Sequence, residues 1–236
     1  LVKPFGQREL LNVIDNVLVM NEIRAQNRML ELELRDTFTS VVQSMISLLS
    51  VKDPYTGEHS GALLALAERL ARKCGLTETD VFDVKIAALL HDIGKIGVPE
   101  AILRKPGRLT PEEKAEMDKH VTYGYSALAG IPKLSRVSEI VLRHHERWDG
   151  QGYPNGLVGE ATPIGARIVA VVDAYDAMTS DRPYRRGMER EIAVARLQQA
   201  SGSQFDPEVV ECFAECLAEG EYFDRSLNLQ GLVNNI

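Results

Sequence analysis

Long apolar runs are missing from this sequence, and cysteine is scarce. No uninterrupted apolar segment, IVAVV at 168–172 included, is longer than six residues, far short of the roughly 18 residues that a membrane-spanning helix needs, so we expect no membrane span. The three cysteines, Cys74, Cys212 and Cys216, include no CxxC pair. This pattern fits a reducing, cytoplasmic compartment, with Cys212 and Cys216 packed at helical spacing in a core.

A basic excess is also missing. The chain carries 27 Lys and Arg against 34 Asp and Glu, a net charge of -7. Proteins that bind nucleic-acid polymers need a basic face to neutralise phosphates, so we expect no such partner. Any phosphate ligand must be attracted locally. With 44% apolar residues, the 236-residue chain can bury the core of one large domain with an appendage.

The patterns that are present are helical. Residues 10–49 contain no proline, and their apolar residues recur at three- and four-residue steps, which predicts one long helix. Its middle is highly charged, which suits a solvated connector or a short two-stranded coil in a homodimer. We expect the end of this helix to pack on the main domain.

After Asp53-Pro54 the chain has the pattern of helices joined by short loops. Thr110-Pro111 opens a capping box and predicts a helix that runs on through His120. The segment 164–180 could pass for a buried strand, but its length favours a helix. Alternating strand pairs and repeats are absent from the sequence, so the predicted fold class is all-α.

The five histidines suggest a metal site. They are His59, His91, His120, His144 and His145, and the intervals between successive groups are about one or two helices long, so different helices could each supply a ligand to one point in a bundle. In HDIGK at 91–95, an α-helix would place His91 and Lys95 on one face. An imidazole, a carboxylate and an ammonium group together can hold metals and a phosphate.

Five segments together resemble the HD-GYP branch of the HD superfamily of metal-dependent phosphohydrolases, and the resemblance covers roughly residues 36–217. The segments are DPYTGEHS at 53–60, HDIGKIGVPEAILRKPGRLTPEE at 91–113, HHERWDGQGYPNGL at 144–157, DAYDAMTSDRPYR at 173–185 and GSQFDPEVV at 202–210.

The resemblance implies a helical bundle of HD-GYP type and a metal centre. It implies two divalent ions, iron or manganese, with Asp92 as the shared ligand. Some family members carry a glutamate that supports a third ion, and Tyr55 stands at that position here. The implied metal ligands are His59, His91, Asp92, His120, His144, His145 and Asp173.

The resemblance also implies residues for the substrate and the chemistry. Asp92 and Lys95 match the catalytic pair, with Lys95 approaching the substrate phosphate. The implied substrate contacts are Lys95, Asp176, Arg182, Arg185 and the loop residues Gly152, Tyr153 and Pro154. At Arg185 the family typically has a lysine, and this change keeps the charge but alters its geometry.

The implied reaction is hydrolysis of cyclic di-GMP to the linear dinucleotide pGpG, and onward to GMP if both bonds are cut. Two alternatives stay open. One is hydrolysis of another nucleotide, because the HD core serves many phosphate substrates. The other is a binding module that holds cyclic di-GMP or a cyclase without turnover. Diguanylate cyclase domains are implied partners through the GYP loop.

The first residues suggest a larger signalling protein. Lys3-Pro4-Phe5 followed by a helix resembles the end of a response-regulator receiver domain, which implies a histidine kinase as upstream partner. We therefore expect a fragment of a longer chain. The expected organisation is a receiver remnant at 1–18, a connector helix at 19–50, the HD-GYP domain at 36–217 and a tail at 218–236.

Overall fold

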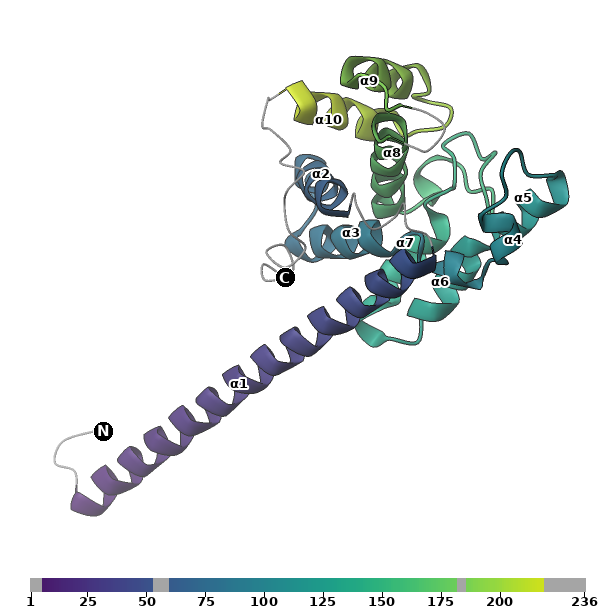
Figure 1. Ribbon diagram of the computed structural model, residues 1–236. Helices are drawn as coiled ribbons and strands as arrows, with labels where there is room; N and C mark the ends of the chain where they lie inside the picture. Colours follow the sequence, from purple (N-terminus) through teal and green to yellow (C-terminus); the bar gives the residue numbers. More distant parts are fainter. Residues whose placement is uncertain (1–5, 53–59, 182–185, 219–236) are drawn as a thin grey trace. The chain divides into compact units, whose positions relative to one another are not determined.

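The computed structural model describes residues 6–52, 60–181 and 186–218, and the regular secondary structure within these ranges is helical (Figure 1). Within these ranges, extended pairing is limited to isolated bridges, which confirms the all-α prediction. Lys3-Pro4-Phe5 and the tail after Ala218 lie outside the described residues. The α-helices are α1 (Gln7–Lys52), α2 (Ser60–Lys73), α3 (Glu78–Leu90), α4 (Glu100–Leu103), α5 (Pro111–Asp118), α6 (His120–Leu128), α7 (Ser135–Arg143), α8 (Ile164–Thr179), α9 (Arg190–Gln199) and α10 (Pro207–Ala218), and the 3₁₀ turns are η1 (Ile93–Gly97), η2 (Pro132–Leu134) and η3 (Gly159–Ala161).

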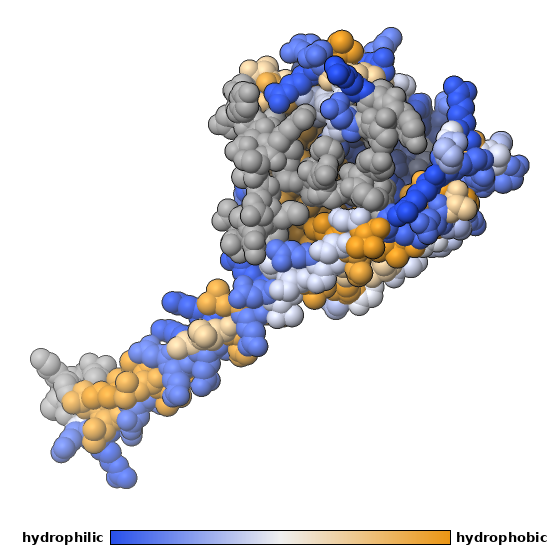
Figure 2. Space-filling view, viewed as in Figure 1, coloured by the Kyte–Doolittle hydropathy of each residue, from blue (hydrophilic) through white to orange (hydrophobic). Residues whose placement is uncertain are grey.

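Helix α1 confirms the predicted long helix and extends it at both ends. The chain divides into two compact units between Ser44 and Met45, so α1 belongs to both. In the first unit, apolar side chains near the start of α1 are exposed, among them Leu11 and Leu18 at 52% and 60%, and Figure 2 shows apolar residues gathered there. In the second unit, Ile46 and Leu49 are buried.

The second unit is organised around α8. This helix packs against α2, α3, α7, α9 and α10, and its Ile168 and Val172 are completely buried. The segment 164–180 is thus a helix, as its length predicted. A helix surrounded by five others buries most of its circumference, which explains why its sequence is apolar on nearly every side.

The predicted helix start at Thr110 is confirmed, but the helix does not continue through His120. The Thr110 hydroxyl accepts from the Glu113 amide at 3.3 Å, and the Glu113 carboxylate accepts from the Thr110 amide at 2.7 Å, which completes the capping box. Helix α5 then ends at Asp118, because the Lys119 amide bonds to the Glu116 carbonyl in a tighter turn. Helix α6 begins afresh at His120.

No helix in the described ranges combines the length and the apolar character needed to cross a membrane.

Candidate metal centre

The described candidate ligands come from four places in the bundle. His91 caps the C-terminus of α3, and Asp92 follows it at the start of η1. His120 is the first residue of α6, while His144 and His145 directly follow α7. Asp173 lies within α8. His59, Arg182 and Arg185 lie outside the described residues.

These elements bring the candidate ligands together around Asp92. One Asp92 oxygen, Oδ2, lies 3.4 Å from His91 Nε2 and 2.7 Å from Lys95 Nζ. The other, Oδ1, lies 3.8 Å from His120 Nε2. Asp173 Oδ1 is 3.6 Å from His91 Nε2. Asp92 therefore has both carboxylate oxygens directed at candidate ligands, as a bridging carboxylate requires.

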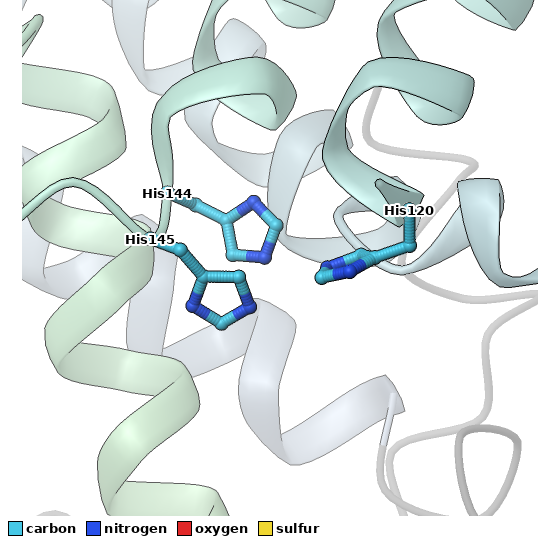
Figure 3. A group of neighbouring side chains, drawn as sticks. All are labelled: His120, His144 and His145. Atoms are coloured by element: carbon cyan, nitrogen blue, oxygen red, sulfur yellow. The ribbon is translucent and has the colours of Figure 1, made fainter. Parts of the chain in front are cut away.

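Three histidine rings face one another (Figure 3), and His120 also lies beside the Asp92 carboxylate. His120, His144 and His145 can each offer a ring nitrogen such that all three atoms lie within 4.8 Å of one another. The Nε2 atoms of His120 and His144 are buried and have no hydrogen-bond partner within the described part of the chain. Buried polar atoms are rarely left unpaired, so this donor set fits a divalent cation.

Backbone carbonyls orient three of the histidines. In His91, His120 and His144, Nδ1 is hydrogen-bonded to the carbonyl three residues earlier, at 2.8, 2.9 and 2.7 Å. A carbonyl oxygen can only accept, so Nδ1 carries a proton, and Nε2 is the nitrogen through which each neutral ring can bind a metal. A hydrogen bond of this kind sets the tautomer of metal-binding histidines and holds their rings in place.

Burial keeps two of the imidazoles neutral. It lowers the pKa of His144 well below its ordinary value, and the neighbouring His145 and His91 lower it further. Burial also lowers the pKa of His145, to about 4, against the opposing effect of Asp173. Because neutral imidazole is the form that coordinates metal, both rings can act as ligands at neutral pH without first losing a proton.

The pKa values of Asp92 and His91 are shifted in opposite directions. Burial acts to raise the pKa of Asp92, but His91 and Lys95 outweigh it and hold that pKa well below its ordinary value. Burial acts to lower the pKa of His91, but Asp92 and Asp173 raise it well above its ordinary value. The pKa values of both carboxylates are lowered, so Asp92 and Asp173 can attract a cation that takes the place of the proton on His91.

The prediction that His91 and Lys95 share one α-helical face was wrong. Helix α3 ends at Leu90, and Ile93–Gly97 forms the 3₁₀ turn η1. In this tighter turn, the Lys95 amide bonds to the Asp92 carbonyl at 2.9 Å. Side chains three residues apart are eclipsed in 3₁₀ geometry, which explains why Lys95 pairs with Asp92.

Gly94 lets η1 lie directly against α6. A Cβ atom at this position would lie 1.8 Å from the His120 carbonyl oxygen and 2.4 Å from the Gly124 amide nitrogen. Both are backbone atoms, which cannot move aside as a flexible side chain can. Close contact between the two backbones therefore places His120 next to Asp92, and a larger residue would separate them.

We expect Gly94→Ala to lower the free energy of unfolding by about 3 kcal/mol, because the overpacked methyl group must displace α6. The displacement carries His120 away from Asp92, so metal retained after dialysis should also fall. Urea denaturation and elemental analysis measure the two effects. Gly130→Ala is the matched control, because a Cβ at Gly130 meets nothing within 4 Å. Equal stability and metal content in the two variants would contradict the role of Gly94.

The GYP residues lie against the histidine cluster. The Tyr153 ring is 5.0 Å from the His145 ring at an interplanar angle of 32°, and the Tyr153-Pro154 peptide bond is cis. A Cβ at Gly152 would lie 2.3 Å from the Arg147 amide nitrogen and 2.6 Å from the His145 carbonyl oxygen. Glycine is therefore required where the loop folds back onto the histidine pair.

The candidate Asp176 lies on α8, where its Oδ1 accepts from the Ser180 hydroxyl at 3.0 Å. Sequence analysis missed two further residues of this region, Asp118 and Glu146. Asp118 was not considered, although burial and the neighbouring Asp118 carboxylate raise the pKa of Tyr153. Glu146 was not considered either, although it directly follows the histidine pair and is 5% exposed. A charged residue next to two candidate ligands was the available signal.

The fold and this site define an HD domain. The family model described as "HD domain" matches residues 43–209, and the chain belongs to that family. It is 44% identical over 183 residues to a cyclic di-GMP phosphodiesterase of Thermotoga maritima, covering 77% of this chain and 50% of the relative. It is 38% identical over 234 residues to a cyclic di-GMP phosphodiesterase response regulator of Xanthomonas campestris, covering 94% of this chain and 62% of the relative.

A third relative is named for a different substrate. The chain is 38% identical over 192 residues to 3'3'-cGAMP-specific phosphodiesterase 2 of Vibrio cholerae, covering 80% of this chain and 37% of the relative. The chain thus spans between about a third and two thirds of the length of these curated relatives. The histidine cluster within an HD domain indicates a centre for divalent metal.

Proposed function

We propose that this chain is the catalytic part of an HD-GYP-type phosphodiesterase that hydrolyses cyclic di-GMP to pGpG. The observation that carries the proposal is the cluster of His120, His144 and His145 beside the Asp92–Lys95 pair, in which the Nε2 atoms of two rings have no hydrogen-bond partner among the described residues. Such a site can hold cations and an anionic phosphodiester side by side. The names of the relatives from Thermotoga maritima and Xanthomonas campestris support cyclic di-GMP as the substrate.

We propose two divalent ions, iron or manganese, with Asp92 as the shared ligand. When bound, the ions supply positive charge and a water of lowered pKa. The positions of both Asp92 oxygens support sharing, and a donor set of imidazoles and carboxylates without cysteine suits either metal. The proposed ligands are His59, His91, Asp92, His120, His144, His145 and Asp173. The proposed number of two rests on Tyr55, which stands where some family members have a glutamate and lies outside the described residues. Metal analysis of saturated protein should give about two ions per chain.

The chain's own residues would bind and orient the substrate. Lys95 lies on the flank of Asp92, where its ammonium group can offset charge on the phosphate oxygens. Asp176 lies one helical turn from Asp173 on α8, so it can reach a nucleotide bound over the metal site. We propose Arg182, Arg185, Gly152, Tyr153 and Pro154 as the remaining contacts on the sequence resemblance.

The test is a product assay on manganese-loaded and iron-loaded protein. Cyclic di-GMP should yield pGpG, with GMP appearing if both bonds are cut, and a chelator should abolish both products. Binding of cyclic di-GMP without any product would favour the non-catalytic binding module. The assay thus separates the enzyme from the binding module directly.

A second candidate substrate is 3'3'-cGAMP. The 38% identical relative from Vibrio cholerae is named for that specificity, and an HD core by itself does not select the base. The two cyclic dinucleotides should be compared at equal concentration in the same assay. A kcat/KM for 3'3'-cGAMP at least as high as that for cyclic di-GMP would replace our first proposal.

We also propose that the chain is the output part of a response regulator. The alignment with the Xanthomonas campestris response regulator covers 94% of this chain, which supports a receiver remnant at 1–18 and a histidine kinase upstream. Exposed apolar residues near the start of α1 support a homodimer through that helix. Sedimentation with and without residues 1–35 tests the dimer, and a monomer in both cases would contradict it. Two expectations remain predictions: diguanylate cyclase domains as partners of the 152–154 loop, and the domain boundaries 19–50, 36–217 and 218–236.

A further inference from the structure

His145 is oriented differently from the other described histidines of the cluster. His91, His120 and His144 each have Nδ1 hydrogen-bonded to the carbonyl three residues earlier. Within the described part of the chain, His145 makes no such bond to a carbonyl, although it directly follows His144, which does. A ligand ring without an orienting partner would rotate and lose metal affinity, so something else must hold it.

Tyr153 is the residue in contact with the His145 ring that can hold it. Its ring lies on the His145 ring at 5.0 Å and 32°, within the range of offset aromatic pairs. Its amide donates to the His145 carbonyl at 3.2 Å, so backbone and ring are both in contact with the same histidine. Tyr153 belongs to a loop, however, and a loop residue can hold a ring only if the loop itself is held.

Glu146 holds the part of this loop that follows Tyr153 and Pro154. One carboxylate oxygen accepts from the Asn155 amide at 2.7 Å, and the other accepts from the Leu157 amide at 3.0 Å. The side chain is 5% exposed, where hydrogen bonds to a charged group contribute more than those on the surface. Tyr153 and Pro154 are therefore fixed from both sides, by the His145 carbonyl before them and by Glu146 after them.

The two oxygens of Glu146 are thus both engaged by backbone amides of the loop. This distinguishes Glu146 from the carboxylates of Asp92 and Asp173, which lie within 4 Å of histidine Nε2 atoms. Glu146 is next to His145 in sequence, yet its contacts are directed to the loop. Any contribution of Glu146 to the metal centre is therefore indirect, through the loop.

We propose that Glu146 is a positioning residue for His145, acting by anchoring residues 155–157 so that Tyr153 stays stacked on the ligand ring. The Glu146–loop–Tyr153 connection takes the place of the carbonyl that orients each of the other three rings. The inference rests on the metal centre of the proposed function, but it does not depend on which cyclic dinucleotide is hydrolysed.

Glu146→Gln in the full chain tests the anchor. A glutamine has one acceptor oxygen, and its amide group would oppose a second N–H donor, so it cannot satisfy both backbone amides. We expect amide exchange at 155–157 to become about tenfold faster, because one hydrogen bond to a buried charge is lost. The affinity for Mn²⁺, measured against a competing chelator, should fall by about tenfold. Fluorescence of Trp148, the only tryptophan, should report the loosened loop.

Glu160→Gln is the matched control, because this substitution makes the same chemical change on an exposed side chain of η3. It should leave amide exchange and Mn²⁺ affinity unchanged. An unchanged Mn²⁺ affinity in a folded Glu146→Gln variant would overturn the proposal. Because both readouts are independent of turnover, their outcome remains valid if the chain hydrolyses a nucleotide other than cyclic di-GMP.

Two Tyr153 variants decide the matter even if Glu146→Gln does not fold. Tyr153→Phe keeps the stacked ring and should retain the Mn²⁺ affinity. Tyr153→Ala removes the ring while leaving the Glu146 hydrogen bonds in place, and it should weaken Mn²⁺ binding by about tenfold. Equal affinities in the two variants would show that the ring does not position His145, and the proposal would be rejected.

Discussion

Asp92→Ala will release the metal and reduce hydrolysis to background. Both oxygens of Asp92 lie within 4 Å of histidine Nε2 atoms, so one substitution removes the group that holds both sides of the site together. We expect kcat/KM to fall by at least about a thousandfold, which corresponds to about 4 kcal/mol of transition-state stabilisation. Metal content after dialysis and product formation from cyclic di-GMP are the two measurements.

The control for this loss is Asp15→Ala, which removes the same group from an exposed position on α1. Helical content should be compared by circular dichroism, so that loss of metal can be separated from loss of fold. A folded Asp92→Ala chain that keeps normal activity without metal would refute the metal-dependent mechanism.

Lys95→Ala will retain the metal and lose turnover. Lys95 Nζ lies 2.7 Å from Asp92 Oδ2, but an ammonium group has no lone pair and cannot be a ligand. Its removal takes away a positive charge beside the proposed phosphate position, so we expect kcat to fall by about a hundredfold or more. Metal content should remain near that of the unaltered chain, so the ratio of activity to bound metal is the decisive quantity.

Lys133→Ala provides the comparison, because Lys133 is an exposed lysine of η2. If Lys95→Ala lost metal and activity in the same proportion, Lys95 would act by stabilising the Asp92 carboxylate and not by contacting the phosphate. That result would move Lys95 from the catalytic residues to the positioning residues. Full activity in Lys95→Ala would remove it from the site altogether.

Local patterns in the sequence predicted several elements correctly. The capping box at Thr110 and the long helix in residues 10–49 depend on interactions between residues near in sequence, which a single chain reveals. The break of α3 at His91 was not predictable in this way. After this break, Gly94 lies against the His120 carbonyl, a contact between residues far apart in the chain.

The sequence by itself determined the all-α fold class, because helix periodicity is a local property, and its resemblance to the HD-GYP branch supplied the set of candidate ligands. Only the tertiary structure decided how those ligands meet. It brought both Asp92 oxygens to the histidines, placed Tyr153 on His145 and buried Glu146 beneath the loop. Distances between side chains on different helices are set by packing of the whole bundle, and spacing along the chain does not encode them.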